Sequence, residues 1–136
     1  MQNIVVSTDK EKLDIAFIHN YLSITSYWAK GRTLDEIKTT IKHCVCFGIY
    51  LNDKQIGFAR VITDYIVFAY LFDVFIDEKH RGNGYSIILL DYIFGYPAFK
   101  EIQGWKLKTT GAQKLYERYG FKVIEDPYKM MEKRKD

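Results

Sequence analysis

The feature that most constrains the fold is a long apolar run that leads into a charged, glycine-bearing turn. Residues 66–76 carry no charge except at Asp73, and the turn Arg81-Gly82-Asn83-Gly84-Tyr85-Ser86 follows them. A second apolar run, residues 87–94, comes directly after the turn. This order predicts a buried strand, a turn and the start of a helix.

The junction between that strand and that helix has the properties of an anion site. Free N–H groups meet the positive end of the helix dipole there. Gly82 and Gly84 permit close approach to a phosphate, and Arg81 adds positive charge. The turn lacks the Lys-Ser/Thr of a P-loop, and Ile87 stands where a dinucleotide fingerprint needs a third glycine. By itself, such a turn also fits ordinary turn chemistry.

The other elements predict an α/β (α+β) fold with one mixed sheet and helices on both faces. Helices are expected after the capping boxes that begin at Thr8 and Thr33, and over residues 111–119. Further strands are expected over residues 4–7, 44–51, 55–63, 105–109 and 121–124. The expected order is βααβββαβαβ, as a single domain spanning residues 1–136.

Composition favours a cytoplasmic protein that binds neither nucleic acid nor membrane. The net charge is only +3, and the one dense basic cluster, residues 129–135, is interpreted as a solvated end. The chain has no signal-peptide pattern and no uncharged apolar run of membrane-spanning length. Cys44 and Cys46 are interpreted as buried hydrophobes, because no second Cys or His pair completes a zinc site. No metal is expected.

Asp73 is the one charge in the long apolar strand, and two interpretations of it stay open. A buried carboxylate costs several kcal/mol, of the order expected for a buried ion, unless it is paired or faces a polar cavity. Asp73 is therefore either a satisfied structural residue or a catalytic carboxylate that attracts or deprotonates an amine.

A second motif, Leu115-Tyr116-x-x-x-Gly120-Phe121, makes the pattern more specific. Alone, Tyr116 fits a core aromatic in a helical stripe. Together with Arg81-x-x-Gly84-x-Ser86 upstream, the chain resembles the GCN5-related N-acetyltransferase (GNAT) superfamily over residues 44–124. The resemblance implies the acyl-CoA N-acyltransferase fold, in which the mostly antiparallel sheet is splayed midway.

The resemblance also implies acetyl-CoA as co-substrate and a role for each matching residue. The main chain of Val74, Phe75 and Ile76 would pair with the pantetheine arm, and Thr109 would stand near the cofactor. The amides of the turn would hold the pyrophosphate, from Arg81, Gly82, Asn83, Gly84, Tyr85 and Ser86. Tyr116 would protonate the leaving thiolate, and Asp73 would face the acceptor amine.

The sequence departs from the family pattern in three respects. Ser86 replaces the usual Gly or Ala, Thr109 replaces an Asn, and Gly111 stands where some relatives carry Asp. No Glu follows the turn as an obvious base.

The acceptor is expected to be a primary amine of a small molecule or peptide, attacked directly in a ternary complex. Tyr27, Trp28, Arg32 and Tyr65 are the candidates to line its pocket. Arg32 would pair with an acceptor carboxylate or with Asp35, and Trp28 would line the pocket or pack against the sheet. Two alternatives stay open: a non-catalytic acyl-CoA-binding domain, and transfer of a longer acyl group. The aromatic content leaves enough apolar surface for a homodimer.

Overall fold

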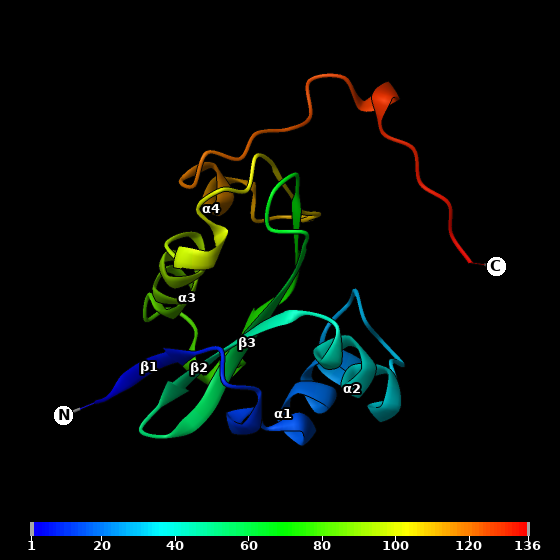
Figure 1. Ribbon diagram of the computed structural model, residues 1–136. Helices are drawn as coiled ribbons and strands as arrows, with labels where there is room; N and C mark the ends of the chain where they lie inside the picture. The colour runs from blue at the N-terminus through cyan, green and yellow to red at the C-terminus, as the bar shows by residue number, and fades with distance from the viewer. Residues whose placement is uncertain (1, 136) are drawn as a thin grey trace.

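The computed structural model describes residues 2–135, which form one five-stranded sheet with helices on both faces (Figure 1). The strands lie across the sheet in chain order: β1 (Ile4–Ser7), β2 (Val45–Leu51), β3 (Lys54–Thr63), β4 (Ala69–Ile76) and β5 (Trp105–Lys106). Neighbouring strands are antiparallel except for β4 and β5, which are parallel. The expected mixed, mostly antiparallel sheet is confirmed.

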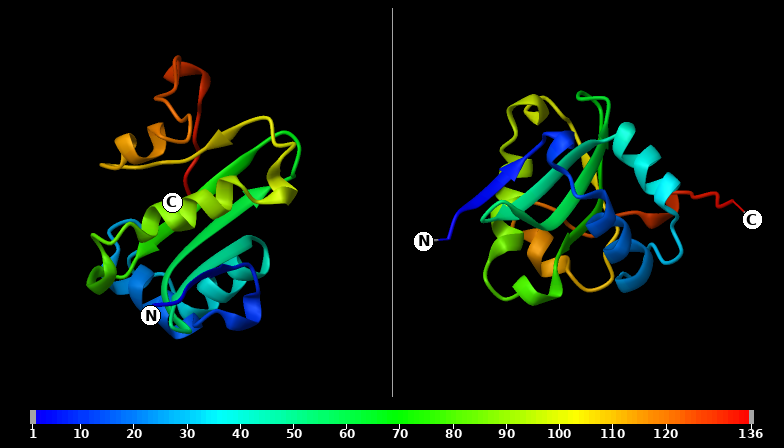
Figure 2. Two further views of the ribbon diagram at one scale, coloured as in Figure 1. Left: turned by 90° about the vertical axis from the view of Figure 1, so that its left-hand side faces the viewer. Right: turned by 90° about the horizontal axis from the view of Figure 1, so that it is seen from below.

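Each face of the sheet has its own helices and its own core (Figure 2). One core contains α1 (Ile15–Asn20) and α2 (Leu34–Lys42), whereas α3 (Tyr85–Phe94) and α4 (Gln113–Glu117) contribute to the other. Neighbouring strand residues enter opposite cores, as do Phe58 and Ala59, because side chains alternate across a strand. Short 3-10 or π turns complete the structure: η1 (Lys10–Lys12), η2 (Tyr21–Thr25), η3 (Glu78–His80), η4 (Pro97–Phe99) and η5 (Pro127–Lys129).

The capping signals predict one of the first two helices correctly. Thr33 begins α2 with the expected reciprocal capping box. The prediction of a helix capped by Thr8 was wrong, because two aspartates provide the caps instead. Asp9 caps the short η1 turn, and Asp14 accepts from the amide of Phe17 at 3.0 Å to begin α1.

Two predicted strands near the C-terminus are short or absent. The strand expected over residues 105–109 ends at Lys106, and residues 121–124 form no strand. Phe121 packs against Phe94 and Tyr116, but Val123 is 82% exposed. Phe121 and Val123 would share one face of a strand, so their different burial does not fit a strand, and no strand pairs with this segment within residues 2–135. The chain then continues as an extended tail (Figure 1).

The sheet opens where β4 and β5 separate, as the splayed fold requires. These strands pair only at Ala69 with Trp105 and at Tyr70 with Lys106. On the other side of β4, Asp73 and Val74 lie together opposite Ala59 of β3, which is a β-bulge. Asp73 has a φ of 54°, a left-handed conformation that aspartate tolerates better than most residues. The separation and the bulge position the site described below.

Within residues 2–135, every helix is too short or too polar to cross a membrane.

Candidate active site

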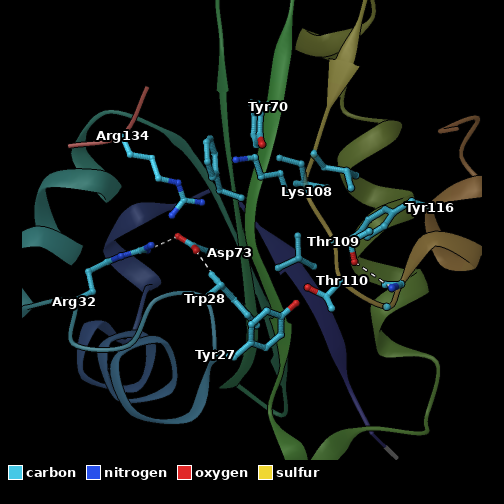
Figure 3. Close-up of a pocket in the computed structure, with 16 residues that line it drawn as sticks. Tyr27, Trp28, Arg32, Tyr70, Asp73, Lys108, Thr109, Thr110, Tyr116 and Arg134 are labelled. Atoms are coloured by element: carbon cyan, nitrogen blue, oxygen red, sulfur yellow. Dashed lines mark hydrogen bonds and ion pairs between the residues drawn. The ribbon is translucent and has the colours of Figure 1, made fainter. Parts of the chain in front are cut away.

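A cleft of about 780 Å³ lies at the opening between β4 and β5 (Figure 3). The loop between η2 and α2 forms one side, and α4 with the loop before it forms the other. The structure brings together seven residues expected at the site: Tyr27, Trp28, Arg32, Asp73, Val74, Thr109 and Tyr116. They come from three segments that are distant in sequence, residues 27–32, 73–74 and 109–116.

Asp73 is the centre of a buried ion cluster at the base of the cleft. Its Oδ2 accepts from Arg60 Nε at 2.6 Å and from Arg32 Nη1 at 2.7 Å. Its Oδ1 accepts from the indole N–H of Trp28 at 2.8 Å. Only 2% of the Asp73 side chain is exposed, so these three donors replace the water that a buried carboxylate loses.

The cluster keeps Asp73 ionised. Burial alone would raise the pKa of this carboxyl, but Arg60 and then Arg32 outweigh it and hold the pKa below the ordinary value. A carboxylate with a lowered pKa and three donors is a poor proton acceptor. The geometry therefore favours the structural interpretation of Asp73 over the catalytic one.

The loop that carries the aromatic residues is held from beneath by a buried serine. Ser26 Oγ donates to Leu22 O at 2.6 Å and accepts from Ala29 N at 3.1 Å. Arg32 N donates to Ala29 O at 3.1 Å, which closes the end of the loop. These local bonds fix the backbone on either side of Trp28, whose indole then reaches Asp73.

Two aromatic side chains of β4 form the floor of the cleft. Tyr70 and Phe72 project from the same face of the strand and stack with centroids 4.3 Å apart. The Arg60 guanidinium carbon lies 4.4 Å from the Phe72 ring centroid, a cation–π distance. The floor thus presents aromatic rings to the cleft, and the Arg60 cation packs against one of them.

Tyr116 lies across the cleft from Tyr27 (Figure 3). The side chain is buried, and its hydroxyl makes no hydrogen bond to any residue in the range 2–135. Burial, with a smaller contribution from Tyr27, raises the pKa of Tyr116 to about 12. The phenol is therefore protonated at neutral pH and has a proton free to donate.

The turn after β4 keeps its amides free. No residue within 2–135 accepts a hydrogen bond from the backbone N–H groups of residues 82–86, although the Arg81 amide donates to Glu78 O. Gly82 and Gly84 have φ of 82° and 78°, and a Cβ built on either would meet nothing within 4 Å. Residues 82–84 are exposed and lead into α3, so five consecutive amides at the start of a helix have no acceptor within residues 2–135.

Three predicted residues have side chains that are placed differently from a direct ligand contact. The Arg81 guanidinium donates to Ile76 O at 3.2 Å and to Tyr21 Oη, so its charge is near the turn but its donors are partly used. Thr109 lines the cleft, but its Oγ1 accepts from Ala112 N at 3.1 Å. Tyr65 does not line the cleft and packs on Phe99.

Sequence reasoning missed several residues that the cleft contains. The sequence did contain a signal for Arg60, because it is the one charged residue between Ile56 and Ile62 of β3. Asp73 is likewise the one charged residue in the apolar run of the neighbouring strand. Tyr70 and Phe72 were readable only as core residues. Lys108, Thr110 and Arg134 had no local signal, because tertiary structure alone brings their segments to the cleft.

A family model described as "Acetyltransferase (GNAT) domain" matches residues 42–123. The chain belongs to the GNAT acetyltransferase family. The match includes β4 and α4, which line the cleft, and the free-amide turn that follows β4.

Individual GNAT relatives agree with this assignment. The crystal structure of a GNAT-family protein from Xanthomonas campestris pv. campestris is 42% identical, covers 97% of this chain and 93% of that one, and has a TM-score of 0.94. "Putative acetyltransferase FG08082" of Gibberella zeae is 29% identical over 135 residues, which span 82% of this chain and 75% of that protein.

A more distant solved structure shares the fold. It is a "predicted acetyltransferase" from Clostridium acetobutylicum whose crystal structure contains acetyl-CoA. It is 16% identical, covers 98% of this chain and 96% of that one, and has a TM-score of 0.72. Within residues 2–135 of the present chain, no group of three or more His, Cys, Asp or Glu side chains forms a metal site.

Proposed function

We propose that the chain is an N-acetyltransferase that moves an acetyl group from acetyl-CoA to a primary amine of a small molecule or peptide, in a ternary complex. One arrangement carries the proposal. The free-amide turn ends a strand whose open edge runs back into a cleft that contains a protonated, unbonded phenol.

The residues present fit the two parts of acetyl-CoA that need protein donors. The amides of residues 82–86 would bind the pyrophosphate, with the Arg81 charge beside them. The β4 main chain at Val74–Ile76, unpaired on its β5 side, would pair with the pantetheine amides as an added strand. Acetyl-CoA supplies the thioester that the amine attacks.

The chain would accelerate this attack mainly by positioning and charge stabilisation. The bulge at Asp73 and Val74 interrupts the regular β3–β4 register, and a main-chain N–H group of this irregular segment would stabilise the oxyanion. Tyr116 would donate its proton to the departing thiolate, because its phenol lines the cleft and makes no hydrogen bond to any of residues 2–135.

Asp73 takes a positioning role in this proposal and does not act as the base. Its ion pair with Arg32 and the hydrogen bond that it accepts from Trp28 hold both side chains in the wall of the cleft. The amine proton would leave to water in the open cleft. If Asp73 were the base, the rate would fall as the pH decreased through the pKa of this carboxyl. The two arginines lower that pKa, so the fall would occur well below neutral pH.

The experiment is calorimetry with acetyl-CoA followed by a thiol-release assay over a panel of amines. Binding together with turnover of at least one amine is the expected result. Binding without any turnover would favour the alternative of a non-catalytic acyl-CoA-binding domain, and absence of binding would defeat both. Repeating the assay with propionyl-CoA and succinyl-CoA tests transfer of other acyl groups.

A further inference from the structure

The side of the cleft that faces the acceptor carries more positive charge than its own carboxylates neutralise. Two carboxylates serve four cations: Asp73 pairs with Arg32 and Arg60, and Glu132 pairs with Lys108 and Arg134. Three of these cations, Arg32, Lys108 and Arg134, line the cleft. The surplus charge requires an anion from solution or from a ligand.

Arg32 is already held in place for such an anion. Its Nη1 bond to Asp73 is the one hydrogen bond that its guanidinium makes within residues 2–135, and 22% of its side chain is exposed. A guanidinium has five N–H donors in a fixed fork, so most donors of Arg32 are free. Asp73 and the closed loop fix its orientation before any ligand arrives.

Arg134 approaches the same place from the other end of the chain. Its guanidinium and that of Arg32 both point toward the Asp73 carboxylate, from different sides (Figure 3). Arg134 Nε donates to Glu132 at 2.8 Å, and Glu132 also pairs with Lys108 at 3.2 Å, so two exposed ion pairs connect the tail to the rim of the cleft. Two guanidinium groups thus converge beside the aromatic floor of Tyr70 and Phe72.

We propose that the acceptor amine also carries a negatively charged oxygen group, a carboxylate or phosphate, bound by Arg32 and Arg134. This rests on the proposed function and names its substrate class. The turn that would hold the pyrophosphate lines no part of this cleft, so the coenzyme's diphosphate does not account for these cations. A polycationic acceptor would meet the surplus positive charge and is disfavoured.

Binding of reaction products in the presence of saturating CoA tests the proposal without requiring turnover. N-acetyltyrosine and N-acetyltyramine differ only by a carboxylate, and N-acetyl-O-phosphoethanolamine and N-acetylethanolamine only by a phosphate. We expect at least one anionic member to bind roughly tenfold tighter or more than its neutral partner, as charge-assisted bonds to arginine imply. The pair with the larger ratio distinguishes carboxylate from phosphate.

Two variants locate the effect. Arg134→Gln should reduce the anionic preference at least threefold, whereas Lys133→Gln, which removes a neighbouring tail charge outside the cleft, should leave it unchanged. Arg32→Lys keeps a cation beside Asp73 but loses the fork, and should also reduce the preference. Urea unfolding of each variant checks that it is folded.

Equal binding within both pairs, or a preference for the anionic product that persists in both arginine variants, would overturn the inference. If acetyl-CoA still bound, the proposed function would stand. Failure of CoA and acetyl-CoA to bind would instead overturn the proposed function, and the inference with it.

Discussion

The turn at residues 82–86 follows β4, whereas the ion cluster is centred on Asp73 within β4, and the two are built in opposite ways. The turn offers consecutive backbone amides of one short segment. The cluster joins side chains from three distant segments on one carboxylate. A backbone site depends on main-chain conformation and tolerates most side chains, whereas a buried ion cluster depends on the presence of every partner.

The largest effect is expected from Asp73→Asn. Removing the carboxylate leaves Arg60 and Arg32 without their shared counter-charge, so the free energy of unfolding should fall by about 3–5 kcal/mol. Urea unfolding at pH 7 measures it. Asp53→Asn is the control, because Asp53 also has a positive φ but is exposed in a hairpin turn. A loss below about 1 kcal/mol for Asp73→Asn, as for a surface pair, would break the comparison.

Lowering the pH tests the stabilisation by the ionised Asp73 carboxylate in a second way. The pKa of Asp73 is lower in the folded than in the unfolded chain, so its stabilisation is complete above the unfolded value of about 3.9 and is lost as the pH falls through the folded value. The stability difference between wild type and Asp73→Asn should therefore shrink below about pH 4. A difference that is constant from pH 7 to pH 3 would contradict this.

Tyr116→Phe tests whether Tyr116 is the general acid of the reaction. We expect kcat to fall roughly 100-fold or more, with little change in the Kd for acetyl-CoA, because the phenol donates its proton only during reaction. Stability should hardly change, since no hydrogen bond is lost. Tyr119→Phe is the control: its hydroxyl bonds Asp91 at 2.7 Å outside the cleft. An undiminished kcat in Tyr116→Phe would remove it as the acid.

Gly84→Ala tests the backbone nature of the turn. A side chain at φ 78° costs about 1–2 kcal/mol of stability and places a methyl group in the space above the free amides. The Kd for acetyl-CoA should rise roughly tenfold, about 1.4 kcal/mol. Gly120→Ala, at φ 91° and also in open space, should lose similar stability without weakening the binding of acetyl-CoA. Equal affinities in both variants would contradict a pyrophosphate site here.

The smallest effect is expected from Ser86→Ala. If backbone amides hold the pyrophosphate, removing one hydroxyl should raise the Kd by no more than about fivefold, near the net value of one hydrogen bond. Calorimetry beside Gly84→Ala gives the comparison. A larger effect from Ser86→Ala than from Gly84→Ala would mean that a side chain, rather than the main chain, dominates binding.

Much of the fold could be predicted because its signals are local. The Thr33 capping box, the hairpin turn at Asn52 and Asp53 and the Gly-x-Gly turn are each specified by a few adjacent residues. The errors arose where two local signals compete or where a partner is needed. Asp14 rather than Thr8 begins the first helix, and residues 121–124 have a strand-like sequence but pair with no strand in the described chain.

The candidate site was predicted where it depends on one segment. The sequence indicated the turn and Tyr116 by their motifs, and it identified Asp73 as unusual because it was a charge in an apolar run. It did not show that Arg60 and Arg32 neutralise Asp73, since β-sheet pairing brings Arg60 to it and loop folding brings Arg32. Nor did it show that Arg134 reaches the cleft.

The sequence alone determined the order of most elements, the glycine-dependent turn and the family motifs, because backbone conformation and capping depend on neighbours in the chain. Tertiary structure decided which of the lone charges meet, how many hydrogen bonds Asp73 accepts, and which cations line the cleft. Those properties depend on burial and on distances between segments up to about a hundred residues apart, and electrostatic interactions in a cleft follow distance in space.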